Sequence, residues 1–207
     1  MLETKNLAFE FNSEFLIQDV NLRIESGNIT VISGISGSGK SLLFSLLTKI
    51  LRANHGELIY PNHIEPRIGA IFQVPALLSN LSIYHNLKLA LQSHFEKMPI
   101  DEIDEKIKNT ISSYDLYKYI HARPDSLSKG QQAIIAFCRA YIVDPDYFFW
   151  DDPYVNIDEN FYPDIDKKID ELKNENKAII FFTNRSEIIS KYADRHYRIE
   201  NRRVVYI

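Results

Sequence analysis

The feature that most constrains this chain is the sequence GISGSGKS, which runs from Gly34 to Ser41. It fits the pattern G-x-x-x-x-G-K-S/T of a phosphate-binding loop. The apolar run Ile29–Ser33 before it predicts a buried strand, and the sequence that continues to Leu51 predicts a helix with one apolar face. A glycine-rich turn between strand and helix lets backbone N–H groups and the positive end of the helix surround phosphate oxygens.

Because a strand and a helix flank the loop, the alternative that its sequence matches the pattern by chance is disfavoured. Lys40 is placed to reach the β- and γ-phosphates of a nucleotide, and Ser41 is placed to offer its hydroxyl to Mg²⁺. The residues expected around the phosphates are Gly34, Ile35, Ser36, Gly37, Ser38, Gly39, Lys40 and Ser41.

Composition is typical of a globular chain of about one domain. The 207 residues are 45% hydrophobic and 25% charged, and the formal net charge of −4 gives no support for a broad nucleic-acid-binding surface. The single cysteine, Cys138, cannot form an intrachain disulfide, which favours a reducing compartment. We expect no signal peptide at the N-terminus. We also expect no membrane span, because no apolar run reaches about 18 residues.

Alternating and apolar segments predict further elements on both sides of the loop. Antiparallel strands are expected before it, a polar loop between Pro61 and Pro66, and a mainly helical region from about Leu81 to Tyr119. The other expected strands are 7–11, 15–17, 20–24, 57–60, 67–73, 147–150 and 178–183, the other helices are 128–143, 164–174 and 186–192, and the closing hairpin pairs 195–199 with 203–207.

Two of these strands end in polar side chains. The short apolar run Tyr147–Trp150 is followed by Asp151-Asp152-Pro153, which is typical of a central parallel strand that delivers carboxylates at its carboxyl end. The strand expected at Ala178–Thr183 is followed by Asn184. Near the N-terminus, Phe9 and Phe11 are read as strand residues with one of them in the core; stacking of one ring on adenine is the less favoured alternative.

An ordered set of motifs narrows the fold. After the phosphate-binding loop come Gln73, the sequence LSKGQ at Leu127–Gln131, the carboxylates Asp151 and Asp152, and finally Asp158. In order and approximate spacing this set resembles the ATP-binding-cassette (ABC) ATPases, and the resemblance covers essentially the whole chain. It implies an α/β P-loop NTPase fold with a mainly parallel central sheet, an N-terminal antiparallel β subdomain, and a helical signature subdomain inserted at about 78–145 in a single domain, 1–207.

The resemblance also implies roles for individual residues. Gln73 would contact Mg²⁺ and the attacking water, Asp151 would hold the hydrated Mg²⁺ together with Ser41, and Phe11 would stack on adenine while Phe9 packs inward. Leu42 would join the phosphate-binding residues as part of the same helical turn. The residues that would meet ATP bound to a second subunit are Ser128, Gly130 and Gln131, with Asp158 in the loop that crosses the dimer interface.

Three positions depart from the family pattern. Asp152 stands where the general base is usually glutamate, Asn184 where a histidine usually contacts the γ-phosphate, and Lys129 where the signature usually has its first glycine. The carboxylate of Asp152 is one methylene shorter, and losing a well-placed base costs roughly 10²–10⁴-fold in rate. We therefore expect normal binding of ATP and Mg²⁺ but slow hydrolysis, with Asp152, Gln73 and Asn184 as the catalytic residues.

The resemblance implies an ATP-binding and ATP-hydrolysing subunit that energises a membrane transporter through ATP-driven dimer closure. Its partners would be an integral membrane permease on a separate chain, which docks at 74–91, and a second ATPase in a homodimer or heterodimer. The protein would lie in the cytoplasm, peripheral on the inner face of the cell membrane. The alternative is an ATP-operated switch or scaffold with little turnover; a soluble ATPase that acts on translation or nucleic acid is disfavoured by the acidic composition and the single cassette.

Overall fold

A six-stranded sheet lies at the centre of the computed structural model, which describes residues 1–61 and 66–207. The loop expected between Pro61 and Pro66 falls on residues outside these ranges. The strand order is β10-β9-β4-β8-β7-β6, and all neighbours are parallel except β9 and β10. The strands are β4 (Ile29–Ser33), β6 (Ile68–Ile71), β7 (Tyr147–Asp151), β8 (Ala178–Phe182), β9 (Arg195–Glu200) and β10 (Arg203–Tyr206).

Three inner strands of this sheet, β4, β7 and β8, are buried along their whole length. This explains their continuous apolar sequences, because a parallel sheet is covered on both faces. Parallel pairing also brings the residues that follow β4, β6, β7 and β8 to one edge of the sheet. The polar residues after these strands can therefore form one site.

A second, antiparallel sheet is built around β1 (Leu2–Phe11) near the N-terminus. β1 pairs with β2, β3 and β5, so the expected N-terminal antiparallel strands are present. The strands expected at 7–11 and 15–17 are longer than the sequence suggested, whereas the one expected at 20–24 is shorter, because Val20 ends β2 and only Arg23–Ile24 form β3. Its other strands are β2 (Glu14–Val20), β3 (Arg23–Ile24) and β5 (His55–Ile59).

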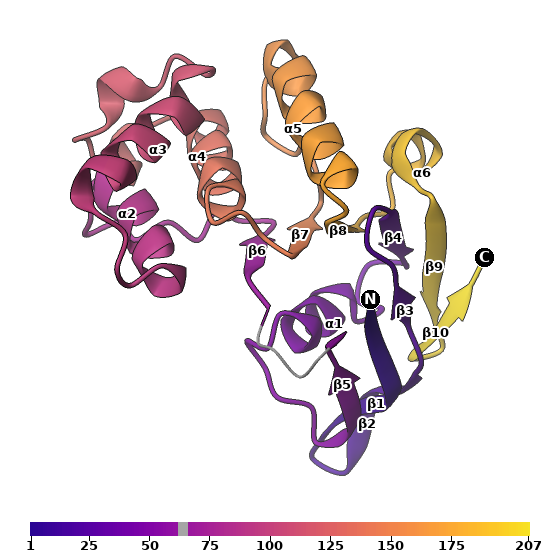
Figure 1. Ribbon diagram of the computed structural model, residues 1–207. Helices are drawn as coiled ribbons and strands as arrows, with labels where there is room; N and C mark the ends of the chain where they lie inside the picture. The colour runs from indigo at the N-terminus through magenta and orange to yellow at the C-terminus, as the bar shows by residue number, and fades with distance from the viewer. Residues whose placement is uncertain (62–65) are drawn as a thin grey trace.

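Helix α1 (Lys40–Leu47) packs between the two sheets (Figure 1). The Phe44 ring lies 5.5 Å from Phe182 and 6.2 Å from Phe149, centroid to centroid, so the helix is fixed against the strands that carry the polar residues. The expectation that it continues to Leu51 is wrong. Lys49 has φ 60°, and a left-handed residue cannot continue a right-handed helix.

Of the remaining helices, α4, α5 and α6 contact the central sheet, whereas α2 and α3 pack against α4; α2, α3 and α4 are grouped together in Figure 1. The mainly helical stretch expected at 81–119 is divided at Pro99. Helical geometry is unfavourable for the residue before a proline, and a new helix starts after Pro99. The helices are α2 (Ile83–His94), α3 (Ile100–Ser112), α4 (Lys129–Tyr141), α5 (Tyr162–Asn174) and α6 (Ser186–Tyr192), with short 3-10 turns at Tyr117–Tyr119, Pro124–Ser126 and Glu159–Phe161.

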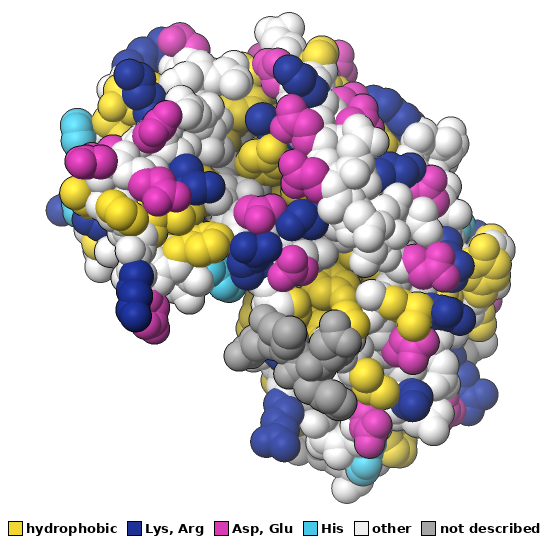
Figure 2. Space-filling model, in the orientation of Figure 1, with side chains coloured by type: hydrophobic (Ala, Val, Ile, Leu, Met, Phe, Trp, Pro, Cys, Tyr) yellow, Lys and Arg dark blue, Asp and Glu magenta, His cyan; other side chains and the backbone are white. Residues whose placement is uncertain are grey.

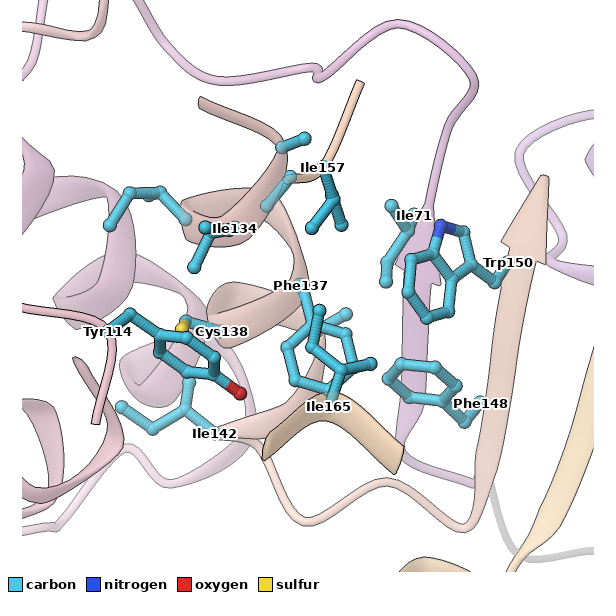
Figure 3. Packing of buried hydrophobic residues seen from close by; sticks show 14 of the residues in the cluster. Ile71, Tyr114, Ile134, Phe137, Cys138, Ile142, Phe148, Trp150, Ile157 and Ile165 are labelled. Atoms are coloured by element: carbon cyan, nitrogen blue, oxygen red, sulfur yellow. The ribbon is translucent and has the colours of Figure 1, made fainter. Parts of the chain in front are cut away.

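Aromatic packing joins this helical group to the sheet. Phe137 of α4 lies 5.4 Å from the Trp150 ring and 5.8 Å from the Phe148 ring, both on β7, and Tyr114 packs on its other side at 6.4 Å (Figure 3). These four side chains are at most 3% exposed. The helices are thus held on the strand that carries the two carboxylates. Within the described ranges, no helix has the length and apolarity needed to cross a bilayer.

Candidate nucleotide-binding site

The glycine-rich loop lies between the end of β4 and the start of α1, as the sequence predicted. Gly37 and Gly39 have φ values of 78° and 104°, conformations that a side chain would make unfavourable. Gly39 is also the N-cap residue of α1, so the loop turns directly into the positive end of that helix. The chain therefore builds the concave backbone that phosphate binding requires.

The first glycine of the loop is needed for space. A Cβ on Gly34 would lie 2.5 Å from Ser38 Oγ and 3.1 Å from the Ile199 carbonyl oxygen of β9. The Ser38 hydroxyl is buried and finds no hydrogen-bond partner among the described residues. A buried hydroxyl that protein atoms leave unsatisfied fits a loop whose remaining partner is a bound anion.

Lys40 is folded back onto the loop that it extends. Its Nζ donates to the carbonyl oxygen of Gly34 at 2.5 Å and lies 3.3 Å from that of Ile35. The ammonium group therefore already lies beside the loop, and a phosphate placed in the loop would compete with these two carbonyls for it.

Asp151 ends β7 and is only 7% exposed. Its Oδ2 accepts a hydrogen bond of 3.4 Å from the Ser41 hydroxyl at the start of α1. Burial, followed by the neighbouring charge of Asp152, raises the Asp151 pKa to about 6, while the Ser41 hydrogen bond and Lys40 act in the opposite direction. Two of the three residues that the sequence suggested for Mg²⁺, Ser41 and Asp151, are thus adjacent, and the third, Gln73, lines the same cavity.

This donor set fits Mg²⁺. Magnesium binds proteins through one or two carboxylates, completes its shell with phosphates and water, and needs oxygen ligands, which Ser41 and Asp151 provide. No group of three or more His, Cys, Asp or Glu side chains suited to a metal occurs in the described parts of the chain. A cation here would therefore depend on the nucleotide for the rest of its ligands.

Asp152 and Gln73 meet across the same edge, although 79 positions separate them. The Gln73 Nε2 donates to Asp152 Oδ2 at 2.9 Å. Asp152 has φ 49°, and its N–H donates to the Phe182 carbonyl of β8 at 2.8 Å, which fixes the turn that carries the carboxylate. Gln73 lies two positions beyond β6, where the sequence had placed it at the end of the strand.

Asn184 follows β8 and reaches the loop through its side chain. Its Oδ1 accepts a hydrogen bond of 2.8 Å from the N–H of Gly34. Asn184 lines two cavities, of about 450 and 940 Å³, on either side of the loop. The smaller cavity is also lined by Lys40, Ser41, Gln73, Asp151, Asp152 and Arg185.

The larger cavity lies between the loop and the β9–β10 hairpin. It is lined by Leu16 of β2 and by Arg198 and Arg202, residues that the sequence did not single out. A third cavity, of about 780 Å³ between α1 and β5, is lined by none of the residues expected to bind phosphate, Mg²⁺ or the attacking water. The residues expected to bind phosphate and Mg²⁺ therefore line the two cavities beside the loop.

The two phenylalanines at the end of β1 differ in burial. Phe9 is half-buried and packs against the core between the two sheets, whereas Phe11 is 60% exposed. Phe11 does not line either cavity beside the loop, where Leu16 does. The exposure leaves Phe11 free for a flat ligand, and its stacking on adenine stays a prediction.

The signature sequence forms the start of α4. The Ser128 Oγ accepts from the Gln131 N–H at 3.2 Å, and the Gln131 Oε1 accepts from the Ser128 N–H at 3.0 Å. The sequence favours an N-cap at Ser128 or Gly130, and this reciprocal capping box shows that it is Ser128. A cavity of about 310 Å³ beside it is lined by Ser128, Gly130, Gln131 and Asp158, and by no residue of the glycine-rich loop.

Comparison with known proteins agrees with this geometry. The family described as "ABC transporter" matches residues 17–155, which is more than half of the chain. The chain belongs to the ABC transporter family. The α/β fold inferred from its motifs is confirmed, with the antiparallel N-terminal sheet and the mainly parallel sheet both present.

Several ABC proteins share sequence with it. It is 33% identical over 165 residues to the spermidine/putrescine import ATP-binding protein PotA of Clostridium novyi, which covers 76% of this chain and 47% of that protein. It is 26% identical over 204 residues to the bacitracin export ATP-binding protein BceA of Halalkalibacterium halodurans, covering 92% of this chain and 80% of that one. The chain thus spans about half the length of the PotA relative.

Solved structures of ABC proteins have the same fold. An ATP-binding subunit of an ABC transporter aligns with a TM-score of 0.89 at 20% identity, over 99% of this chain and 88% of the other. A dimeric ATP-binding cassette bound to ADP and Pi aligns with a TM-score of 0.86 at 22% identity, over 99% and 96%. At this identity the likeness concerns the fold.

Proposed function

We propose that this chain is the ATP-binding and ATP-hydrolysing subunit of a membrane ABC transporter, which it energises through ATP-driven dimer closure. The observation that carries the proposal is the single cavity of about 450 Å³ that gathers Lys40, Ser41, Gln73, Asp151 and Asp152 beside a phosphate-binding loop. These residues come from three separate parts of the sequence, and one nucleotide with Mg²⁺ would use all of them.

Each side chain in this cavity has a distinct task in the proposal. The loop N–H groups and Lys40 bind the phosphates, and Ser41 with Asp151 holds Mg²⁺, which when bound neutralises charge that develops on the phosphates. Asp152 accepts a proton from the attacking water, which Gln73 helps to orient through its hydrogen bond to Asp152. The short Asp152 side chain is the reason to expect slow turnover.

A second chain completes the proposed machinery. Ser128, Gly130 and Gln131 line a cavity that no residue of the phosphate loop reaches, so within one chain they contact no nucleotide bound there. A second copy, or a related ATPase, would bring its own loop to this surface. The dimeric cassette of the same fold supports this arrangement as an analogy.

The membrane partner is proposed to dock beside Gln73. Val74 and Leu78 are 76% and 43% exposed, an apolar surface next to the residue that contacts Asp152. The proposed position of the protein is the cytoplasmic face of the membrane, and a role at a membrane is supported by relatives whose names include import or export. Figure 2 shows acidic and basic side chains mixed on the face in view, which gives no support for a nucleic-acid partner.

A switch or scaffold with little turnover is the second candidate. Two hydrogen bonds within the site favour this candidate. Gln73 binds Asp152, and Asn184 binds Gly34, so these polar groups already have partners without a nucleotide. Such a protein would stay dimeric with ATP even when its membrane partner is present. Persistence of that dimer without phosphate release would favour this candidate over the transporter subunit.

The test of the proposed function is steady-state release of phosphate from Mg-ATP by the wild type and by Asp152→Glu. We expect slow turnover in the wild type and a gain of up to roughly 10²-fold in the variant, because glutamate carries the carboxylate one methylene closer to the water. ATP binding should be the same in both. A wild type that binds no ATP would overturn the proposal.

A further inference from the structure

The segment that follows β8 contacts two functional loops at once. Asn184 accepts the hydrogen bond from the Gly34 N–H at 2.8 Å, and Arg185 donates through NH1 to the Pro153 carbonyl at 3.0 Å. Gly34 opens the phosphate loop, and Pro153 follows the carboxylate Asp152. Two adjacent side chains thus hold the two sides of the cavity in which the chemistry is proposed.

The identity of the contacting atom of Asn184 follows from its partner. A backbone N–H can only donate, so the side-chain atom that faces Gly34 is the carbonyl oxygen of the amide and not its nitrogen. This bond uses the amide oxygen and leaves the two N–H donors of the amide nitrogen Nδ2. The contact that Asn184 makes is therefore with the backbone of the phosphate loop, and a contact of its amide nitrogen with the γ-phosphate is the alternative from which the test below distinguishes it.

Both backbone polar groups of Gly34 make hydrogen bonds. Its N–H is bound to Asn184, its carbonyl oxygen accepts from the Lys40 Nζ, and its Cα faces Ser38 and Ile199 too closely to admit a side chain. The Asn184 bond joins the loop to the end of β8, which pairs with β4 along the sheet. Removing this bond would release the first residue of the loop and would leave the other residues of the cavity in place.

We propose that Asn184 is a positioning residue that acts on the nucleotide through Gly34 and the phosphate loop. The inference rests on the proposed function only in that the loop binds ATP. It differs from a γ-phosphate contact in one measurable respect. ADP and ATP share the α- and β-phosphates that the loop holds, so a change in loop geometry weakens both, whereas loss of a γ-phosphate contact weakens ATP alone.

The first test compares Mg-ADP with a non-hydrolysable Mg-ATP analogue by titration calorimetry in the wild type, Asn184→Ala and the control Asn174→Ala. Asn174 is an exposed residue at the end of α5, far along the chain from the loop. We expect Asn184→Ala to weaken both nucleotides by a similar factor of roughly 2–12, the fold-change of one ordinary hydrogen bond. The control should bind like the wild type.

The outcomes of this titration are distinct. Weaker binding of the ATP analogue with unchanged ADP would overturn the proposal in favour of a γ-phosphate contact, and no change for either nucleotide would overturn it as well. A wild type that binds neither nucleotide would instead overturn the proposed function. Thermal unfolding of each variant separates a lost contact from a lost fold.

A second test observes the bond itself without nucleotide. In amide ¹H–¹⁵N spectra, hydrogen exchange of the Gly34 N–H should be faster in Asn184→Ala than in the wild type. Asn184→Asp keeps an accepting oxygen at the same chain length, so it should retain the protection of this amide. Equal exchange in the wild type and Asn184→Ala would show that the side chain does not hold Gly34, even if the alanine variant proved too unstable for calorimetry.

Discussion

The glycine-rich loop and the signature sequence are both turns that open a helix, yet they differ in what surrounds them. The loop lies at the carboxyl edge of the central sheet, where Gln73, Asp151, Asp152 and Asn184 converge on it. The signature lies at the start of α4, where Ser128 and Gln131 satisfy each other and the nearby cavity lacks any residue of the loop.

This difference shows which contacts each region can make within one chain. A parallel sheet gathers residues from distant parts of the sequence, so the loop has its chemical partners within the same chain. A helix N-terminus needs only local residues to form, so the signature is stable without any nucleotide nearby. The comparison predicts that changes in the loop affect nucleotide binding directly, and that changes in the signature affect stability and association.

The largest effect is expected for Lys40→Ala. Among the described residues, Lys40 has the only ammonium group that lines the smaller cavity, and removing a donor aimed at developing charge costs roughly 10²–10³-fold in rate. Steady-state phosphate release measures the loss, with thermal unfolding as the control for folding. Turnover equal to the wild type would contradict the central place given to the loop.

A smaller effect is expected for Tyr154→Phe, in the segment that joins the two regions. The buried Tyr154 hydroxyl donates to Asp166 at 2.5 Å and lies 2.8 Å from the Tyr192 hydroxyl. Losing a buried hydrogen bond to a charged group should lower the free energy of unfolding by roughly 1.5–3 kcal/mol. Denaturant unfolding measures it, and Tyr117→Phe, at an exposed tyrosine, is the matched control.

The smallest effect is expected for Ser128→Ala. The variant loses the N-cap of α4, which should cost about 1 kcal/mol and lower Tm by about 2–4 °C. Binding of ADP to the single chain should be unchanged, because Ser128 does not line either cavity beside the loop. Weaker ADP binding in a folded variant would remove the distinction between the two regions.

Elements with local causes were predicted well from the sequence. The phosphate-loop strand at Ile29–Ser33 and the last helix at Ser186–Tyr192 have the predicted bounds, and the N-cap of α4, Ser128, is one of the two residues that the sequence offered for it. Their signals are continuous apolar residues, glycine placement and capping side chains, which act within a few positions of the chain.

The sequence by itself therefore determined the loop, its flanking strand and helix, and the order of motifs that identifies the family. Only the tertiary structure decided that Asn184 binds the Gly34 N–H from 150 positions away, that Gln73 binds Asp152, and that Leu16 lines the larger cavity. The physical reason is that periodicity and capping act locally, whereas a hydrogen bond between side chains at the edge of a sheet depends on which strands pair and how each turn directs its residues.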